Sequence, residues 1–376
     1  MKQTYDVAVI GGGIVGLAHA WAAARQGKSV ALFERGRQAH GASIRNFGMV
    51  WPIGQPVGEL YETALQSRRR WLELSQAGAL WAAECGSLHL AYREDERAVL
   101  EEFCENAAAD FQVRWLSPAE VLKRSPAANP DGLLGGMWSD TELCVNPRQA
   151  VAEIPRWLAE RFSVDTYFST SIVRVQHPHL TAADGRTWRS ERILVCSGSD
   201  FETLFPDIFA ETELTRCKLQ MMKTAAQPDA WRLGPHIAGG LTLQHYTSFA
   251  DCSSLPALRK RIAEETPELN RYGIHVMASQ NNRGEVILGD SHEYDEEISP
   301  FDKSEIETLM LRELRRLLRL PDWNIAERWS GVYAKLPGRS HFEAEPESGV
   351  KIVVAPGGAG MTMSFGLAEQ IWNRWS

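Results

Sequence analysis

The chain has 376 residues, of which 44% are hydrophobic and 23% are charged. This balance argues against an intrinsically disordered chain, and the length predicts two or three domains. With 40 Lys and Arg against 48 Asp and Glu, the net charge is −8. The sequence therefore lacks the basic excess of a nucleic-acid binder, and we expect no nucleic-acid partner.

The cysteines and one apolar stretch indicate whether the protein binds a metal and where in the cell it is located. None of the six cysteines forms a C-x-x-C pair, and no histidine cluster accompanies them. We therefore expect no zinc or other metal and no disulfide framework, which suits a reducing cytoplasm. Residues 7–24 carry no Asp, Glu, Lys or Arg, as in a membrane span or signal peptide, but their glycines would break such a helix. The sequence therefore predicts a cytoplasmic protein without a membrane span.

The N-terminal segment predicts a strand, a helix and a second strand. Residues 5–10 are apolar and β-branched, residues 14–26 are rich in alanine, and residues 29–33 are apolar again. This order is that of a βαβ unit, with Gly27 as the stop signal of the helix.

A glycine motif lies where the first strand meets the helix. Gly11 permits the tight turn, Gly13 lets the backbone approach a pyrophosphate, and Gly16 lets helix and strand pack closely. The first N–H groups of the helix, at Ile14 and Val15, would then face phosphate. Glu34 follows the second strand, near the offset expected for the carboxylate that binds ribose hydroxyls. Together these features predict dinucleotide binding; the alternative is that the glycines serve only a tight turn.

The remaining chain continues the alternation of strands and helices. Helices are expected at 59–74, 94–109, 147–160 and 304–320, with a capping box at Ser117 and Glu120 opening a further one. Strands are expected at 87–92, 134–138, 164–175, 193–196, 218–224, 273–279, 285–289 and 350–355, and hairpins around 184–185 and 281–284.

A second glycine cluster favours FAD over NAD as the dinucleotide. Gly357, Gly358 and Gly360 follow the last strand and open a helix at Met361 and Thr362. The N-terminus of that helix could stabilise negative charge on a reduced flavin. A site built from both ends of the chain suits FAD, whose flavin lies far from its adenine. We expect an α/β fold, α+β overall, in which a Rossmann-like FAD-binding domain (1–84, 142–215 and 327–376) accompanies an antiparallel-sheet substrate domain (85–141 and 216–326).

Several stretches carry a family resemblance over most of the chain. Residues 9–16 with Glu34-Arg35, the strand 193–196 with Ser197-Gly198, residues 286–290, residues 329–333 and the Gly357 cluster resemble FAD-dependent amine and amino-acid oxidases of the glycine oxidase, sarcosine oxidase and D-amino acid oxidase superfamily. Residues 43–52 and 243–249 resemble a subgroup associated with organophosphonate catabolism. The resemblance implies oxidation of 2-aminoethylphosphonate or its N-methyl relative.

The resemblance also implies a set of cofactor contacts. Ser43 should touch the pyrophosphate, residues 45–49 should run beside the flavin, and Val173 should meet the adenine. The full set of expected FAD-binding residues is Gly11, Gly13, Ile14, Val15, Gly16, Glu34, Arg35, Ser43, Arg45, Asn46, Phe47, Gly48, Met49, Val173, Cys196, Ser197, Gly198, Gly331, Gly357, Gly358, Gly360, Met361 and Thr362. Covalent attachment is not expected, because no cysteine follows Cys252.

The sequence motifs point less clearly to the residues that bind the substrate than to those that bind FAD. Related amino-acid oxidases often place an Arg two residues after the glycine at 331, but this chain has Tyr333. An α-amino-acid substrate is therefore disfavoured. The anionic group could instead meet Arg45, Lys335 or Arg339, with Met49 also near the substrate. For Arg45 the alternative is contact with the FAD pyrophosphate, and for Lys335 it is a surface salt bridge.

Flavin-dependent amine oxidation asks little of the protein beyond orientation and proton transfer. The candidates for orienting the amine or relaying its proton are Tyr246, His245, Tyr333 and His275. For His245 and Tyr246 the alternative is a satisfied pair in a sheet. Hydride transfer to flavin N5 and hydrolysis of the imine would give phosphonoacetaldehyde, with molecular oxygen or another acceptor reoxidising the flavin.

Other functions stay open. A glycine or sarcosine-type oxidase and a dehydrogenase with a non-oxygen acceptor share the predicted cofactor. A flavin hydroxylase is suggested by Gly289-Asp290, which superficially resembles a ribose-contacting motif. A non-catalytic FAD-binding protein, such as a partner in tRNA modification, belongs to a different class.

Overall fold

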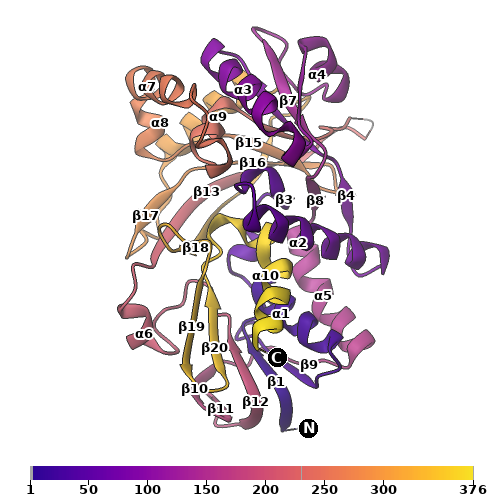
Figure 1. The fold of residues 1–376 in the computed structure, drawn as a ribbon, viewed down its shortest axis with the longest axis vertical. Coiled ribbons are helices and arrows are strands. Elements are labelled where there is room, and N and C mark those ends of the chain that lie inside the picture. The colour runs from indigo at the N-terminus through magenta and orange to yellow at the C-terminus, as the bar shows by residue number, and fades with distance from the viewer. Residues whose placement is uncertain (1–2, 230, 376) are drawn as a thin grey trace.

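In the computed structural model, which describes residues 3–229 and 231–375, two large sheets lie at opposite ends of the long axis (Figure 1). The first sheet has a parallel centre in which β12, β1, β2 and β9 lie side by side, with β20 parallel to the other edge of β12. Its strands are β1 (Thr4–Ile10), β2 (Val30–Phe33), β9 (Asp165–Tyr167), β10 (Ile172–Gln176), β11 (His179–Ala182), β12 (Thr187–Val195), β19 (Phe342–Glu347) and β20 (Val350–Val354). The near-continuous burial of β1 is typical of a parallel strand covered on both faces.

The second sheet is mostly antiparallel. Its order is β17-β13-β16-β15-β14-β5-β7-β6, with β18 on the other side of β13. The strands are β5 (Ser87–Ala91), β6 (Arg114–Leu116), β7 (Gly135–Ser139), β13 (Thr215–Ala226), β14 (His236–Ala238), β15 (Met277–Gln280), β16 (Glu285–Gly289), β17 (Glu293–Asp295) and β18 (Ile325–Lys335). A small third sheet joins β3 (Met49–Val50), β8 (Leu143–Val145) and β4 (Ala82–Glu84).

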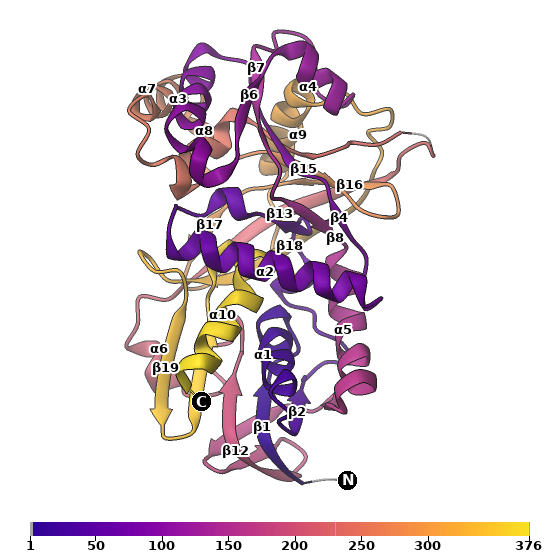
Figure 2. The ribbon, with the colours of Figure 1, turned by 45° about the vertical axis from the view of Figure 1, so that its right-hand side comes forward.

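Helices cover the two large sheets separately, as Figure 2 shows. Around the first sheet lie α1 (Ile14–Arg25), α2 (Glu59–Gln76), α5 (Pro147–Phe162), α6 (Pro206–Ala210) and α10 (Gly360–Trp375). Around the second lie α3 (Glu94–Phe111), α4 (Pro118–Arg124), α7 (Leu255–Glu265), α8 (Pro267–Arg271) and α9 (Ser304–Leu317). Short 3₁₀ turns are η1 (Ala42–Ile44), η2 (Pro52–Gly54), η3 (Gly240–Gln244), η4 (Thr247–Phe249) and η5 (Gly357–Ala359). The predicted α/β fold is confirmed.

Helices from both ends of the chain pack together in the first core. Trp21 of α1 meets Phe365 of α10 edge to face at 5.4 Å, and Trp71 of α2 meets the same ring at 5.0 Å. All three rings are almost fully buried. Such aromatic pairs add about 0.5–1.5 kcal/mol beyond the area they bury, so α10 is held firmly against α1.

Two predicted elements end earlier or begin later in the structure. The strand predicted from 273 begins only at Met277, because Gly273 has a positive φ of 53°. The helix predicted to 320 ends at Leu317, because Leu318 adopts extended backbone and bridges to Ala128. The hairpins at 184–185 and 281–284 and the capping box at Ser117 are present as predicted.

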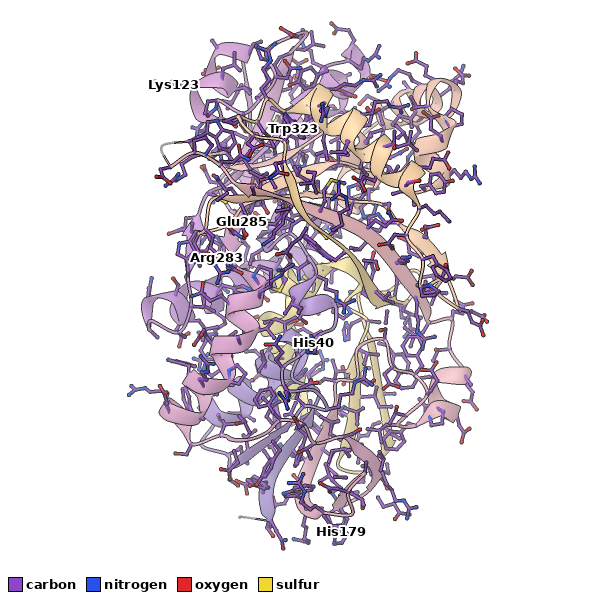
Figure 3. The ribbon with its side chains drawn as sticks, turned by 180° about the vertical axis from the view of Figure 1, so that it is seen from behind. His40, Lys123, His179, Arg283, Glu285 and Trp323 are labelled. Carbon is purple, nitrogen blue, oxygen red and sulfur yellow. The ribbon has the colours of Figure 1, made fainter. Side chains whose placement is uncertain are left out.

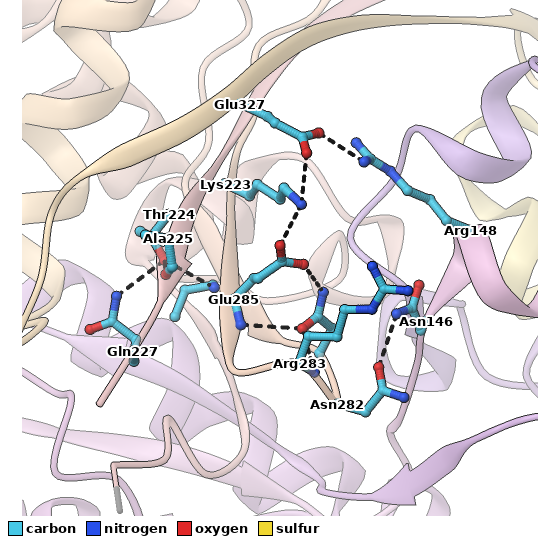
Figure 4. A network of polar contacts seen from close by, with 12 residues as sticks. Asn146, Arg148, Lys223, Thr224, Ala225, Gln227, Asn282, Arg283, Glu285 and Glu327 are labelled. Atoms are coloured by element: carbon cyan, nitrogen blue, oxygen red, sulfur yellow. Dashed lines mark hydrogen bonds and ion pairs between the residues drawn. The ribbon is translucent and has the colours of Figure 1, made fainter. Parts of the chain in front are cut away.

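The predicted domain boundaries follow the sheets except at β18. Strand β18 pairs with β13 from Lys335 to Ile325, so it belongs to the second sheet although most of it was assigned to the FAD-binding domain. The division into domains stays a prediction. A polar network joins the two parts here: Lys223 of β13 binds Glu285 of β16 and Glu327 of β18, and Glu327 binds Arg148 of α5 (Figure 4).

The apolar N-terminal stretch forms a strand, a turn and a helix of the first core. Residues 7–24 run through β1, the glycine turn and α1. No helix among the described residues has both the length and the apolar character needed to cross a membrane. All six cysteines are free. The cytoplasmic location stays a prediction.

Candidate functional site

One cavity of about 1030 Å³ runs between the two sheets. It is lined by the glycine turn before α1, the end of β2, the segment 39–49, the end of β12, β18 and the start of α10. The wall also includes His40, which Figure 3 labels midway along the molecule, between His179 at one end and Lys123 at the other. This volume is just above the range of about 300–1,000 Å³ usual for ligand pockets, which suits a large cofactor together with a small substrate.

The glycine turn has the geometry that the motif predicts. Gly11 has a φ of 111°, and a Cβ there would lie 2.2 Å from the carbonyl oxygen of Cys196. A Cβ on Gly16 would lie 1.9 Å from the carbonyl oxygen of Gly11, so this residue sets the packing of helix on strand. A Cβ on Gly13 would meet only Ser43 Oγ, at 3.1 Å. A side chain on Gly13 would therefore project toward the cavity, whereas a side chain on Gly11 or Gly16 would clash with the protein backbone.

The first N–H groups of α1 are only partly satisfied by the chain. Gly13 provides no side-chain cap, and Ser43 Oγ of η1 accepts a hydrogen bond from the Ile14 N–H at 2.9 Å. Neither Ile14 nor any other residue of the first turn is acidic. A helix start of this kind, open to a cavity, is a ready site for phosphate.

Glu34 closes the nucleotide end of the cavity. Its carboxylate accepts hydrogen bonds from the N–H groups of Gly12 and Gly36, at 2.9 and 2.8 Å. These bonds fix the carboxylate beside the glycine turn, where a ribose would lie. Arg35 is exposed and forms an ion pair with Asp200 at 2.7 Å.

The start of α10 closes the cavity from the other end of the chain. The Thr362 hydroxyl accepts a hydrogen bond from the Trp51 N–H at 2.9 Å, and the Met361 carbonyl accepts one from Trp71 Nε1 at 2.7 Å. These bonds tie the second glycine cluster to β3 and α2. No acidic residue occupies the first turn of α10, so its positive end is not neutralised there.

The segment from Ser43 to Met49 forms one long wall. Arg45 donates to the carbonyl of Ser330 at 3.0 Å, which links this segment to β18. The Asn46 side chain donates to the carbonyls of Ala42 and Ser43 and accepts from the Gly48 N–H, and so holds the loop in shape. Arg45 makes no ion pair among the described residues.

Histidines gather where the cavity meets the second sheet. The rings of His245 and His275 lie 3.9 Å apart, and His292 lies 4.7 Å from His245 and 4.8 Å from His275. Burial, and to a smaller degree neighbouring positive charge, holds the pKa of His245 and His275 well below the usual range; burial lowers that of His292 to about 4. The three imidazoles are therefore neutral at pH 7.

The nitrogens of these three histidines lie within 4.8 Å of one another, a spacing that would admit a metal. However, the rings of His275 and His292 are stacked with only 14° between their planes. Two parallel rings do not direct their in-plane lone pairs at one point. The expectation of no metal stays a prediction.

Tyrosines and one lysine complete this end of the cavity. The Tyr246 hydroxyl donates to Met277 Sδ at 3.4 Å, and Tyr333 lies against His292 with ring centroids 6.4 Å apart. Burial raises the pKa of both phenols, so both stay protonated. Lys335 donates to the Tyr294 hydroxyl at 3.3 Å and makes no ion pair in the described ranges. The alternative that Lys335 forms a surface salt bridge is therefore wrong.

Most of the residues that the sequence predicts for the site line this cavity. Gly16, Gly48 and Val173 do not: the first two face the protein backbone, and Val173 is 44% exposed, one residue beyond the lining residue Ile172. His245 and Tyr246 lie between η3 and η4 and not in a strand, so their alternative as a sheet pair is wrong. The roles given to all these residues stay predictions.

Two lining residues, Asp290 and His292, were not expected in the site. They follow β16, and the N–H and carbonyl groups of Asp290 bond to those of His275 at 3.1 and 3.2 Å. Extending the 281–284 hairpin along its register, in which Met277 lies opposite Gly289, places Asp290 opposite Val276 and within one residue of His275. Residues 286–290 carry the family resemblance, and the Gly289-Asp290 pair also resembles a hydroxylase motif, but neither resemblance predicts Asp290 as a site residue. Asp290 belongs to the second sheet, whereas Glu34 ends β2 of the first, which disfavours a ribose contact.

The arrangement fits a flavin dinucleotide. The glycine turn, a helix start without its own cap, a fixed carboxylate at the end of β2, and a second helix start at the far end are joined by one cavity. These features define a dinucleotide-binding flavoenzyme.

The comparisons with known proteins agree with this class. The model of the DAO family, described as FAD dependent oxidoreductase, matches residues 6–374, and the chain belongs to this family. The predictions of an oxidoreductase and of FAD as cofactor are thereby confirmed.

The individual relatives share low sequence identity with this chain. The glycine oxidase of Bacillus licheniformis is 28% identical over 220 residues, which is 55% of this chain and 58% of the relative. The chain thus spans little more than half the length of that relative. One component of the opine oxidase of Rhizobium meliloti is 22% identical over 88% of this chain and 82% of its own.

Among solved structures, glycine oxidase from Geobacillus kaustophilus matches with a TM-score of 0.77 and 18% identity. The match covers 100% of this chain and 95% of the other. Iminodiacetate oxidase from Chelativorans sp. BNC1 matches with a TM-score of 0.71 and 16% identity, covering 98% and 96%. At these identities the structures support the fold alone, which the sequence predicted.

Proposed function

We propose that the protein oxidises a small amine bearing a strongly anionic group, with 2-aminoethylphosphonate or its N-methyl form as substrate. The observation that carries this proposal is Lys335, a cation that lines the cavity beside neutral histidines without a carboxylate partner in the described ranges. A cation so placed is available for a phosphonate, which binds through charge-assisted hydrogen bonds. The Tyr333 hydroxyl, in place of an arginine fork, does not offer the bidentate match that favours an α-carboxylate.

The chain's own groups position the reactants. Arg45, Ser43 and the start of α1 hold the pyrophosphate, and Glu34 holds the ribose. Bound FAD supplies the two-electron acceptor for oxidation of the carbon next to the amine nitrogen, and the resulting imine hydrolyses to phosphonoacetaldehyde. Tyr246 and Tyr333 stay protonated and can donate hydrogen bonds to the substrate, while the neutral ring of His245 or His275 can accept one. The FAD is noncovalent in this proposal.

A second candidate is oxidation of glycine or sarcosine, favoured by the similarity to glycine oxidases over about half of the chain. Arg339 is exposed at the rim of the same cavity and could meet a carboxylate as well as a phosphonate. The two candidates share the cofactor site and differ in the anion they would bind.

Anaerobic reduction of the FAD-loaded protein separates the candidates. Bleaching of the flavin is followed with 2-aminoethylphosphonate, its N-methyl form, glycine and sarcosine. We expect faster bleaching by a phosphonate; faster bleaching by glycine or sarcosine refutes the proposed substrate. Peroxide released in air, in a 1:1 ratio to amine, would assign molecular oxygen as the acceptor; little peroxide would assign a dehydrogenase. Failure of every amine would leave a non-catalytic FAD-binding protein.

The lysine and arginine are tested by separate variants. Lys335→Gln should weaken phosphonate binding by about tenfold or more, since a charge-assisted hydrogen bond contributes about 1.5–3 kcal/mol. Arg339→Gln removes a more exposed charge and should weaken binding less. Unchanged affinity in both variants would remove both residues from the anion site.

A further inference from the structure

A single carboxyl group at the histidine end of the cavity has no assigned purpose. Asp290 lines the cavity but is only 5% exposed. Its Oδ1 atom has no hydrogen-bond donor within the described residues. His275 Nε2 lies 3.6 Å from Oδ1 and His292 Nε2 lies 3.8 Å from Oδ2, and both distances are beyond hydrogen-bond range. A buried carboxyl left without a donor costs stability, so its retention calls for a ligand.

The other carboxylates of the cavity wall are already engaged at the nucleotide end. Glu34 accepts from two backbone N–H groups beside the glycine turn. Asp200 binds Arg35 and the Thr203 hydroxyl. Asp290 is therefore the lining carboxyl that is free to receive a cationic group, and it lies where the tyrosines and histidines of the predicted substrate site gather.

We propose that Asp290 is the counter-ion of the substrate's ammonium group and accepts the proton that the amine must lose before oxidation. The proposal rests on the proposed function in one respect, namely that the substrate is an amine. An N–H bond of the ammonium breaks, an O–H bond forms on the carboxylate, and the electron pair stays on nitrogen as its lone pair. Asp290 would thus act as a catalytic residue, and Lys335 would hold the opposite end of the substrate.

The surroundings suit this exchange. Burial raises the pKa of Asp290 well above its usual range, so the carboxyl holds a proton once it has received one. An ammonium group bound beside it favours the charged form, so Asp290 can act as the counter-ion before the proton moves. The neighbouring histidines are neutral and do not offer a competing cation. The Tyr246 ring lies 6.0 Å from the ring of His275, whose Nε2 is 3.6 Å from Asp290 Oδ1, so the phenol and the carboxyl flank the same histidine.

The test compares Asp290→Asn with wild-type protein, both loaded with FAD. Asparagine keeps the shape and removes the charge and the basic oxygen. Rates of anaerobic flavin reduction at increasing 2-aminoethylphosphonate give a dissociation constant and a limiting rate. Perturbation of the flavin absorbance gives the affinity for ethylphosphonate, which has the anion but no ammonium. Asp295→Asn on β17, exposed and outside the cavity wall, is the matched control.

We expect Asp290→Asn to weaken 2-aminoethylphosphonate at least about 30-fold and to lower the limiting rate, since loss of one member of a buried charge pair is costly. Ethylphosphonate affinity should stay within about threefold of wild type, because Asp290 makes no contact with the anion. Equal binding and reduction of 2-aminoethylphosphonate by variant and wild type would overturn the proposal. Equal weakening of both ligands would also overturn it, since Asp290 would then only shape the pocket.

Further outcomes of the same experiment distinguish failure of the role proposed for Asp290 from failure of the proposed substrate. If wild type is reduced by glycine or sarcosine and by neither phosphonate, the substrate is wrong, but Asp290→Asn must still impair reduction by the active amine. If no amine reduces wild type, both proposals fail. Asp290→Ser removes the carboxyl without added volume and replaces Asp290→Asn if the latter does not fold. Loss of FAD from both variants would assign Asp290 a structural role and overturn the proposal.

Discussion

Two glycines of the nucleotide turn should respond differently to the same substitution. A methyl group on Gly16 would lie 1.9 Å from the carbonyl oxygen of Gly11, whereas contacts of real Cβ atoms essentially never fall below 3.0 Å. Helix α1 and the turn would have to separate by about 1 Å. Overpacking costs about 1–3 kcal/mol, and the rigid backbone contact places this case at the upper end. Alanine's higher helix propensity offsets about 1 kcal/mol. We therefore expect Gly16→Ala to lower the free energy of unfolding of the apoprotein by about 2 kcal/mol.

Gly13→Ala should instead leave the stability of the apoprotein nearly unchanged and weaken the binding of FAD. Its Cβ would meet only Ser43 Oγ at 3.1 Å, and its backbone (φ −73°, ψ 175°) is open to any residue. The stability of the apoprotein should change by less than about 1 kcal/mol, while FAD affinity falls tenfold or more because the methyl group intrudes on the pyrophosphate.

Urea unfolding of the apoprotein and fluorescence titration with FAD measure the two quantities separately for each variant. Equal loss of apoprotein stability in both variants, or unchanged FAD affinity in Gly13→Ala, would refute the division of roles.

Three further outcomes are expected. Ser43→Ala removes the acceptor of the Ile14 N–H and should cost about 1 kcal/mol in urea unfolding, with weaker FAD binding by titration. Lys223→Met leaves Glu285 and Glu327 without their shared cation; since Lys223 is 7% exposed, unfolding should show a loss of about 3 kcal/mol, and an unchanged midpoint would contradict this. His89 is fully buried, and burial lowers its pKa to about 3, so only the unfolded chain takes up a proton as pH falls below 6.5. The free energy of unfolding should therefore decrease as the pH is lowered, by about 2 kcal/mol between neutral pH and pH 5. In parallel urea titrations, the free energy of unfolding of His89→Leu should depend less on pH over this range.

The local parts of the fold and site were predictable from sequence. The turn from Gly11 to Gly16 and the carboxylate of Glu34 lie within one βαβ unit, where spacing along the chain fixes spacing in space. The 281–284 hairpin was predictable for the same reason. Elements whose ends depend on a distant partner were not: α9 stops at Leu317 because Leu318 bridges to Ala128, nearly two hundred residues earlier.

The histidine cluster shows why the substrate end was harder. His245 lies between two 3₁₀ turns, and no periodic pattern in the sequence reports its distance from His275 or His292. Their contact depends on how η3 lies over the second sheet. The hairpin register, which the sequence does contain, places Asp290 opposite Val276, and a one-residue shift then pairs Asp290 with His275. The contact among the histidines therefore depends on tertiary structure, whereas the hairpin pairing alone predicts the neighbour of Asp290 to within one residue.

The construction of the cofactor site from both ends of the chain has a consequence for biosynthesis. Residues 357–375, which complete the cavity and pack on α1, are translated long after the glycine turn at 11–16. At about 5–20 residues per second, the ribosome needs roughly 20–70 s to cover that interval. During this time the turn can form, but α10, whose Phe365 packs against Trp21 of α1, does not yet exist. Capture of FAD is therefore a late event, and a nascent chain stalled before residue 357 should emerge without the cofactor even when FAD is abundant.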